Sequence, residues 1–584
     1  MSTIQNFIKR YYIKVTCSNT RFHKYNNNYT NYKNYNYTTR QFSNNNNYAM
    51  RVYLIAGEPS GDVIGANLIE SLKKQTNNNS IEFSGVGGER MIQAGLSKSI
   101  ISIDNIAVMG TIELISKIYN LNKCVNKVVD DIIDNDPDVI VAIDAKGFNK
   151  AVLKRYYKKK YGKADRQLLQ NDLPISPTII GKKISPPPPI VQYVAPSYWA
   201  YKSSSKDKPK ELLKHFNKIY HILPFEGELL NENNVPNLYV GHSAVEEMMK
   251  LFHNNLNNNN SRNNHNNFNN NNNDSNNFLL HLRKNIDSYR ENARIRFKID
   301  DNNSINKIDK VLLLFPGSRL QEVDKSLPLI YDMLKKLLIN NVNDDNITQK
   351  YNEKWTIIIP TLSVNTPVGK KVAAFVNNWK QNHKNMPYIN NIIYVNNDDV
   401  EMKRDSFAAA DVAIAMSGTV VTELALANIK TLVIYPGSMI TGMLAKQLAK
   451  VKYVSIPNIM TNRLLIDELL FDNCTVENLT TKAESLLFNF NISKEKEEEE
   501  EEEGKSDKDN NTILDDCLLS LLNHNYTMVE HENRKIVEGN DEEEQQEEKK
   551  DVVHFHFPSD IAANDILKLG NDYIFHLIED KNEI

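Results

Sequence analysis

The sequence predicts an α/β protein built from two Rossmann-like domains that face a cleft. Short apolar runs of strand length alternate with amphipathic stretches of helix length, first over residues 50–252 and again over residues 310–490. Several of these runs end at turns rich in glycine, proline and serine, where parallel sheets carry their ligand loops. We therefore expect two parallel sheets, each covered by helices.

Composition narrows the class of protein. With 584 residues the chain is too long for one core, and its formal net charge of -3 gives no electrostatic case for nucleic acid as a partner. The four cysteines are scattered without metal-ligand spacing, so we expect no structural zinc and a reducing compartment. No apolar run reaches the length of a transmembrane helix, so contact with a membrane is expected to be peripheral.

Residues 1–49 contain no acidic residue, and their lysines and arginines lie among Tyr, Asn, Thr and Ser. This composition is typical of an organellar transit peptide. The alternative is an asparagine-rich disordered tail, since asparagine runs recur elsewhere in the chain. Those other runs contain acids, which favours targeting, and we expect a mitochondrial protein on the matrix side.

The first domain is expected to begin with a strand at 52–56, a turn, and an amphipathic helix over 63–74. Ser60 has the chemistry of a helix N-cap, and Asp62 falls in the first helical turn, where a carboxylate is favourable. The glycines of this turn lack the spacing of the dinucleotide fingerprint, so no nicotinamide cofactor is indicated.

A carboxylate follows a later strand of this domain. The helix after the loop at 108–114 is expected to end near Asn135, and the next apolar strand, 137–143, leads to Asp144. Ligands of open parallel sheets bind beyond the carboxyl ends of the strands, where Asp144 can accept a proton from a substrate hydroxyl. Spacing alone leaves an alternative open, in which Asp144 caps the helix near Gly147.

Low-complexity stretches separate these units. Residues 156–189 are basic and then proline-rich, which predicts a surface insertion. Residues 253–309 include an asparagine-rich run that cannot bury a core, and predict an insertion and linker. Residues 494–552 are acidic and are expected to be disordered, before a final helix within 556–584.

The second domain restarts with a strand at 311–315 and a sharp turn that carries Arg319. A guanidinium at such a turn can form bidentate hydrogen bonds to a diphosphate. Further strands are expected at 355–360 and 392–395, and a helix is expected to run through 468–470.

Residues 408–435 predict a helix end, a buried strand, a tight turn, a second helix and another strand. Ser417, Gly418 and Thr419 form the turn, which presents backbone N–H groups at the positive end of a helix and suits a phosphate. Glu423 follows one turn later, within reach of a sugar hydroxyl on that phosphate. The alternative is that Ser417 caps a helix and Glu423 is a solvated surface charge, because short motifs often arise by chance.

Short motifs also follow one another in a specific order. In the first half they read Ala-Gly-Glu-Pro-Ser-Gly-Asp at 56–62, Val-Met-Gly at 108–110, Ile-Asp-Ala at 143–145, Phe-Asn at 148–149, Tyr-Val-Ala-Pro-Ser at 193–197, Leu-Pro-Phe-Glu at 223–226 and Val-Gly-His at 240–242. In the second half they read Pro-Gly-Ser-Arg at 316–319, Ser-Gly-Thr at 417–419, Tyr-Val-Ser at 453–455, Pro-Asn at 457–458 and Glu-Leu-Leu at 468–470. Over most of residues 51–490 and the final helix, this series resembles the lipid-A-disaccharide synthase family of inverting glycosyltransferases.

The resemblance implies a GT-B-type fold, with an acceptor domain over 50–252 and a UDP-sugar domain over 310–490. It implies that UDP-diacylglucosamine donates its sugar to the primary hydroxyl of diacylglucosamine 1-phosphate, with no metal or cofactor. Asp144 is implied as the general base and Glu423 as the ligand of the ribose hydroxyls. The diphosphate would be held by Arg319, Ser417, Gly418 and Thr419. Further contacts are expected on the acceptor side from Ser60, Asp62, Met109, Asn149 and Ser197, and on the nucleotide side from Asn458.

The chain departs from the family pattern at two places. The family typically reads Asp-Ala-Pro-Asp-Phe-Asn where this chain has Lys146 and Gly147 after Asp144-Ala, a change on the acceptor side. The family has a basic residue after a tyrosine where this chain has Pro436, a change near the phosphates.

Two other classes remain as alternatives. A related UDP-sugar enzyme, such as an epimerase or a transferase to another lipid, would share Arg319 and Glu423 but not the motifs at 108–110 and 193–197. An inactive lipid- or nucleotide-binding paralogue would have lost Asp144 or Arg319, and this chain keeps both.

A substrate with two acyl chains stays in a bilayer, so we expect the protein to dock peripherally on the inner membrane. Two sets of apolar residues beside lysines are candidates for an interfacial patch, although ordinary core packing explains them equally well. The sets are Ile115, Ile118 and Tyr119 near Lys117 and Lys123, and Met439, Ile440, Met443 and Leu444 near Lys446. The sequence is also compatible with an oligomer.

Overall fold

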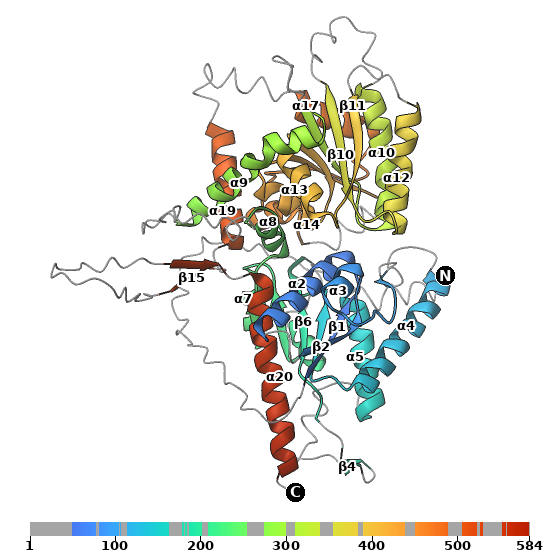
Figure 1. Cartoon of the computed structure of the whole chain (residues 1–584), viewed down its shortest axis with the longest axis vertical. Coiled ribbons are helices and arrows are strands. Elements are labelled where there is room, and N and C mark those ends of the chain that lie inside the picture. Colours follow the sequence, from blue (N-terminus) through green and yellow to red (C-terminus); the bar gives the residue numbers. More distant parts are fainter. Residues whose placement is uncertain are drawn as a thin grey trace, which may run out of the picture.

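The computed structural model contains two six-stranded sheets in which adjacent strands run parallel, and it confirms the predicted fold class (Figure 1). The first sheet has the order β2-β1-β3-β6-β7-β8 and the second β11-β10-β9-β12-β13-β14. The structure describes residues 49–76, 81–103, 106, 114–162, 178–179, 182–183, 186–200, 208–253, 274–299, 310–338, 354–382, 389–437, 450–488, 505–522, 526–529, 552–555 and 557–582.

Strands and helices alternate through the first domain. Its strands are β1 (Met50–Ala56), β2 (Ile81–Val86), β3 (Val139–Ile143), β6 (Ile190–Tyr193), β7 (Lys218–His221) and β8 (Asn237–Tyr239). Its helices are α2 (Pro59–Gln75), α3 (Glu89–Ala94), α4 (Leu114–Asn135), α5 (Lys146–Tyr161) and α7 (Glu226–Glu232), with 3-10 turns η2 (Tyr198–Ala200) and η3 (Lys208–Lys214). A short hairpin, β4 (Thr178–Ile179) with β5 (Lys182–Lys183), lies within the predicted insertion.

The second domain repeats the pattern. Its strands are β9 (Lys310–Phe315), β10 (Trp355–Thr361), β11 (Ile389–Asn396), β12 (Val412–Met416), β13 (Lys430–Pro436) and β14 (Asp467–Phe471). Its helices are α10 (Leu320–Leu338), α12 (Pro367–Asn382), α13 (Val400–Ala409), α14 (Thr419–Leu426), α16 (Ile456–Thr461) and α17 (Val476–Phe488).

Both sheets are covered on both faces, which explains why their central strands are continuous apolar runs. Successive side chains of a strand point to opposite faces. In β3, Val141 packs into one apolar cluster and Ile140 and Ala142 into another. In β9, Leu313 and Leu314 likewise enter different clusters. Each sheet therefore sits between two helical layers.

The chain returns to the first domain at its C-terminal end. Helix α20 (Pro558–Asn582) packs against α2, far from the second sheet that precedes it in sequence (Figure 1). Asp565 accepts hydrogen bonds from Tyr220 Oη and Lys218 Nζ, both at 2.6 Å, and Ser559 Oγ donates to Glu246 at 2.6 Å. The predicted final helix is thus part of the first domain.

Helix α8 (Ser243–His253) connects the domains. It lies within the range expected for the first domain, yet it packs against α13 and α14 of the second. It also contacts the first domain, since Lys250 Nζ donates to Asn67 Oδ1 on α2 at 2.9 Å. The domain boundary therefore passes through α8, because this helix is amphipathic with a partner on each side.

Two stretches expected to lack structure contain packed helices. Helix α9 (Asp274–Arg296) lies in the predicted linker, and Arg294 reaches Asp411 with a separation of 3.5 Å. Helix α19 (Lys505–Leu522) lies in the predicted acidic disordered tract, and its buried Leu518 and Leu521 pack in the core of the second domain. The structure thus corrects the expectation of disorder for α19 and of a linker for α9, because apolar residues of both helices are buried by neighbours distant in sequence.

Local boundaries also differ from the sequence prediction. Helix α5 continues to Tyr161, and its buried Tyr156 and Tyr157 belong to the core rather than to a surface insertion. Residues 468–470 lie in β14, paired with β13, and not in a helix. Among the residues that the structure describes, no helix is long and apolar enough to cross a bilayer.

Candidate active site

The strand order places the predicted site residues at the switch point of each sheet. In the first sheet β1 neighbours β3, and in the second β9 neighbours β12, where the connections turn to opposite sides. Ligands of such sheets bind outside the carboxyl ends of these central strands. Asp144 follows β3 and Arg319 follows β9, while Ser417 follows β12. The topology therefore brings the three residues to the expected edges.

Asp144 sits on a strained turn that neighbouring elements hold in place. Asp144 and Ala145 have φ of 48° and 37°, a left-handed conformation that is unfavourable for non-glycine residues. The Asp144 carbonyl accepts hydrogen bonds from Asn149 Nδ2 at 2.7 Å and Gln192 Nε2 at 3.0 Å. Asp144 N donates to the Tyr193 carbonyl at 2.9 Å. These three hydrogen bonds hold the backbone of Asp144 in place. None of them uses an oxygen of its carboxylate, which a ligand can therefore contact.

The pKa of Asp144 is raised from its ordinary value to about 6. Partial burial is the largest cause, and the nearby Glu58 carboxylate adds to it, whereas Arg319 opposes it. A carboxylate with this pKa is mostly ionised at neutral pH yet more basic than an exposed aspartate. That combination suits a general base.

Arg319 joins the two domains beside Asp144. Its guanidinium contacts the Glu58 carboxylate, from the turn after β1, and donates to Glu322 Oε1 at 2.9 Å. The same Glu322 accepts the backbone N–H of Ser318 at 3.1 Å, so the turn after β9 is organised around one carboxylate. Part of the Arg319 side chain reaches solvent, with 41% of it exposed. An anionic ligand that enters here can replace Glu58 as its partner.

The turn between β12 and α14 is open to a ligand. Gly418 has an extended backbone that any residue can adopt, and no heavy atom of the described residues lies within 4 Å of the position a Cβ would take. A larger residue would therefore fit here without strain or collision. The space beside Gly418 is open, and a ligand could occupy it. Ser417 Oγ donates to the Val454 carbonyl at 3.4 Å, and Thr419 begins α14.

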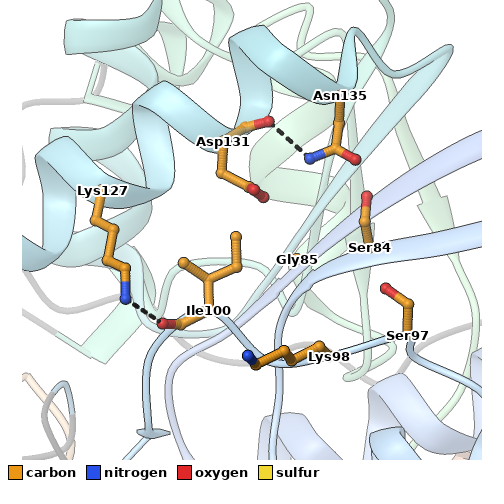
Figure 2. Close-up of a pocket in the computed structure, with 8 residues that line it drawn as sticks. All are labelled: Ser84, Gly85, Ser97, Lys98, Ile100, Lys127, Asp131 and Asn135. Atoms are coloured by element: carbon orange, nitrogen blue, oxygen red, sulfur yellow. Dashed lines mark hydrogen bonds between the residues drawn. The ribbon is translucent and has the colours of Figure 1, made fainter.

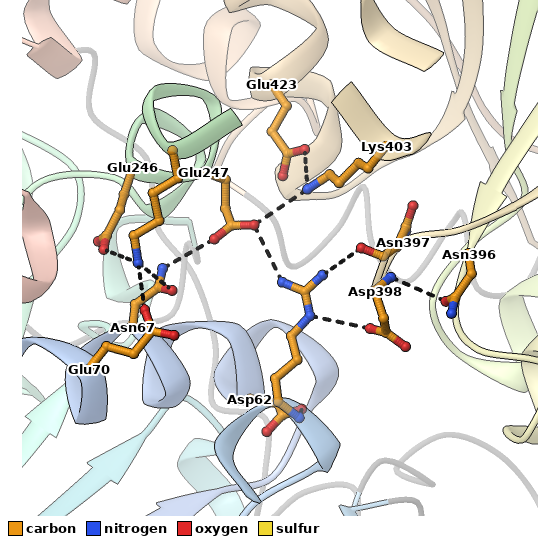
Figure 3. A network of polar contacts seen from close by, with 12 residues as sticks. Asp62, Asn67, Glu70, Glu246, Glu247, Asn396, Asn397, Asp398, Lys403 and Glu423 are labelled. Atoms are coloured by element: carbon orange, nitrogen blue, oxygen red, sulfur yellow. Dashed lines mark hydrogen bonds and ion pairs between the residues drawn. The ribbon is translucent and has the colours of Figure 1, made fainter. Parts of the chain in front are cut away.

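Glu423 is buried rather than solvated, so the alternative of a surface charge was wrong. Its carboxylate lies 3.4 Å from Lys403 Nζ, and the same ammonium lies 3.4 Å from Glu247 on α8 (Figure 3). Glu247 in turn pairs with Arg90 at 3.4 Å. It also accepts a hydrogen bond from Asn67 Nδ2 at 3.2 Å (Figure 3). The predicted ribose residue therefore belongs to a charge network that crosses the domain interface.

The predicted acceptor residues have several different environments. Ser60 lies inside α2, whose N-cap is Glu58, so the expectation that Ser60 caps this helix was wrong. Asp62 is buried and accepts backbone N–H groups from Gly88 at 2.7 Å and Met91 at 3.1 Å, which holds the start of α3. This carboxylate has a structural role, and an acceptor contact by Asp62 would compete with these bonds.

The remaining acceptor predictions separate as well. Asn149 is fully buried behind Asp144, and its Oδ1 has no hydrogen-bond partner among the described residues. Ser197 is exposed after β6. Met109 lies outside the described residues. Asn149 therefore holds the Asp144 turn through its hydrogen bond to the Asp144 carbonyl. Of Asn149 and Ser197, only Ser197 is exposed to a ligand.

Asn458 is satisfied by the protein itself. Its Nδ2 donates to the Ile466 carbonyl at 2.7 Å and to Glu468 Oε1 at 2.8 Å, while its Oδ1 accepts from Leu465 N at 2.8 Å and Ile466 N at 3.0 Å. An amide offers no further strong hydrogen-bonding positions. The structure thus leaves no free group on this side chain for a nucleotide, and Asn458 fastens α16 to β14 instead.

Sequence reasoning missed Glu58, Glu247 and Lys403. Glu58 stood inside the motif at 56–62, two residues before Ser60, and its position after β1 was the signal that could have found it. Glu247 and Lys403 lie on different helices of different domains, so no local pattern marks their contact.

The described residues also line a cavity of about 310 Å³ away from these switch points (Figure 2). Its walls come from β2, the segment after α3, and α4, and they include Lys127 and Asp131. No predicted site residue lines it. Within the described ranges, no group of three or more His, Cys, Asp or Glu side chains is arranged to hold a metal ion.

A sequence model of the family described as lipid-A-disaccharide synthetase matches residues 52–165, 177–268 and 284–519. Among curated relatives, the lipid-A-disaccharide synthase of Granulibacter bethesdensis is 28% identical over 438 residues, covering 75% of this chain and 86% of the relative. A probable mitochondrial lipid-A-disaccharide synthase of Arabidopsis thaliana is 29% identical over 444 residues, covering 75% of this chain and 80% of the relative.

Solved structures of UDP-GlcNAc 2-epimerases overlap with the chain at low similarity. The enzyme of Methanocaldococcus jannaschii is 14% identical, with a TM-score of 0.39 over 75% of this chain and 93% of the other. The enzyme of Neisseria meningitidis is 12% identical, with a TM-score of 0.40 over 75% of this chain and 91% of the other.

Proposed function

The chain belongs to the lipid-A-disaccharide synthetase family and is a glycosyltransferase, and from this premise we propose its substrates and the roles of its residues. The donor is UDP-diacylglucosamine, and the acceptor is the primary hydroxyl of diacylglucosamine 1-phosphate. The products are the disaccharide 1-phosphate and UDP. The observation that carries the proposal is the position of Asp144, with its raised pKa, beside the Arg319–Glu58 contact that joins the domains.

Asp144 acts as the general base. Its carboxylate accepts the proton of the acceptor hydroxyl, whose oxygen forms a bond to the anomeric carbon of the donor. The bond between that carbon and the diphosphate breaks, UDP leaves with the electron pair, and the configuration at carbon inverts. The anchored backbone of Asp144 supports this role because a fixed base loses little entropy on reaction.

Arg319 and the turn at 417–419 hold the diphosphate, whose negative charge grows as UDP departs. Support comes from the exposed guanidinium, from the open space at Gly418, and from the N-terminus of α14. Glu423 accepts hydrogen bonds from the ribose hydroxyls. Its carboxylate is buried and faces a single ammonium, that of Lys403, among its described contacts, so it retains acceptor capacity.

The reaction is tested by incubating the purified full chain with both substrates and analysing the lipids by mass spectrometry. We expect the disaccharide 1-phosphate to appear only when donor and acceptor are both present. UDP-GlcNAc alone serves as the control for epimerase chemistry. Conversion of UDP-GlcNAc to an epimer, or hydrolysis of the donor without disaccharide, would refute the proposal.

We also propose that the protein works in the mitochondrion, docked on the matrix side of the inner membrane. The acid-free leader over residues 1–49 supports this location, and the Arabidopsis thaliana relative is named as mitochondrial. The side chains at 115–119 and 439–446 that were considered for docking lie outside the described residues. Tagged protein should sediment with mitochondrial membranes and be released by carbonate, and recovery in the cytosol would count against the location.

A further inference from the structure

Two lysines surround one tyrosine ring beside Asp144. Lys146 is the first residue of α5 and Lys208 the first of η3, while Tyr198 begins η2 after β6. The Lys146 ammonium lies 4.2 Å from the centre of the Tyr198 ring, and that of Lys208 lies 5.8 Å from it. Since β3 and β6 are neighbours, the group lies at the same carboxyl edge of the first sheet as Asp144.

Among the described residues, the positive charge of this group is only partly compensated, because Glu211 attracts the Lys146 ammonium without forming an ion pair with it. Lys150, one helical turn after Lys146, pairs with Glu211 at 3.5 Å. Within the part of the chain that the structure describes, no carboxylate pairs with Lys146 or Lys208 in the same way. The pKa of Lys146 is lowered to about 8: burial is the largest cause, repulsion from Lys208 and Lys150 adds to it, and attraction to Glu211 opposes it. An anion bound here would relieve that repulsion.

We propose that Lys146 and Lys208, on either side of Tyr198, form the subsite that binds the 1-phosphate of the acceptor sugar. This inference rests on the proposed function, which supplies an acceptor that carries a phosphate. Lys146 lies two residues from Asp144, so a sugar whose hydroxyl meets Asp144 can place its phosphate against the lysines. Lys146 is also the first residue of α5, and the N-terminal end of a helix is favourable for an anion.

The sequence of the turn points the same way. Where the family reads Pro and Asp after Asp-Ala, this chain has Lys146 and Gly147. The first change adds a positive charge and the second removes a negative one. Both changes make the turn more attractive to a phosphate, and the tyrosine ring keeps the Lys146 ammonium in place.

Phosphate chemistry is shared by the acceptor and by anionic headgroups of the bilayer, so the experiment must distinguish them. Turnover is measured for wild type and Lys146→Ala with the phosphorylated acceptor and with its dephosphorylated form. Loss of a charge-assisted contact should raise KM for the phosphorylated acceptor by about 10- to 100-fold and leave kcat/KM for the dephosphorylated form unchanged. Lys146→Arg should retain most of the discrimination. Lys154→Ala, at an exposed lysine on the same helix, is the matched control.

An equal loss with both acceptors would overturn the subsite, since it would mark Lys146 as a general structural residue. Binding of soluble glucosamine 1-phosphate, followed by calorimetry, provides a readout that does not need turnover. If wild type transfers no sugar but binds this ligand through Lys146, the subsite stands and the proposed reaction fails. If Lys146→Ala binds glucosamine 1-phosphate normally but loses adsorption to vesicles containing an anionic phospholipid, the lysines serve the membrane surface and the inference is overturned.

Discussion

Replacing Lys403 by methionine removes an ammonium that Glu247 and Glu423 share at the domain interface. Lys403 is buried, and its partners Glu247 and Glu423 have only 12% and 10% of their side chains exposed. Methionine keeps most of the side-chain volume, so the change isolates the charge. Because all three side chains are largely buried, a carboxylate that loses the ammonium loses a partner for its charge in a poorly solvated place.

The magnitude follows from which carboxylate loses its partner. Lys403 is the strongest of the contacts that lower the pKa of Glu247, but Glu247 keeps two others, Arg90 at 3.4 Å and Asn67 at 3.2 Å, so its charge is still compensated. Glu423 loses the ammonium that lies 3.4 Å away. Removing one partner of a buried ion pair costs about 3–5 kcal/mol. Because only Glu423 is left without a described partner, we expect the free energy of unfolding of Lys403→Met to fall by this amount once.

The assay is urea denaturation of the full chain, followed by tryptophan fluorescence. Lys482→Met is the matched control, because its pair with Asp467 is about half exposed on each side and such pairs contribute about 0–1 kcal/mol. Lys403→Arg, which keeps the charge, should fall between wild type and Lys403→Met. A Lys403→Met protein within about 1 kcal/mol of the Lys482→Met control would refute the reasoning.

Further predictions concern the site and its pH dependence. Because the pKa of Asp144 is about 6 and the base must be ionised, kcat/KM should rise with pH and level off above about 6; a profile flat through this range would argue against Asp144. Arg319→Ala should weaken UDP binding in calorimetry by about 1.5–3 kcal/mol, and normal UDP affinity with a weaker acceptor would reverse the assignment of the domains. Burial lowers the pKa of His242 from 6.5 to about 4, so the protein should lose stability as pH falls through this window, since the unfolded chain takes up the proton first. His242→Gln should flatten that part of the stability profile in urea titrations, and an unchanged slope would exclude His242 as its source.

The sequence predicted the fold and the edge residues because both depend on local patterns. Apolar runs of strand length marked β3, β9 and β12, and the residue that follows each strand could be read directly. Asp144 and Arg319 were found in this way, and the structure brings them together through Glu58.

Contacts between distant segments could not be read in the same way. The pairing of Lys403 with Glu247 depends on how α8 sits between the domains, and no spacing encodes it. Helix α19 was missed because its apolar run, residues 513–522, lies inside a stretch whose overall composition is acidic. The short apolar run at 468–470 fits either a helix or a strand, and only its pairing with β13 decides.

The most direct test of the central claim compares wild type with Asp144→Asn, using labelled donor and unlabelled acceptor. Asparagine preserves the size of the side chain but cannot accept the proton. Wild type should release UDP and disaccharide in equal amounts, while the variant should bind UDP normally and turn over about 10²–10⁴ times more slowly. Near-full turnover by Asp144→Asn, or release of UDP without disaccharide in wild type, would contradict transfer by an Asp144-activated hydroxyl.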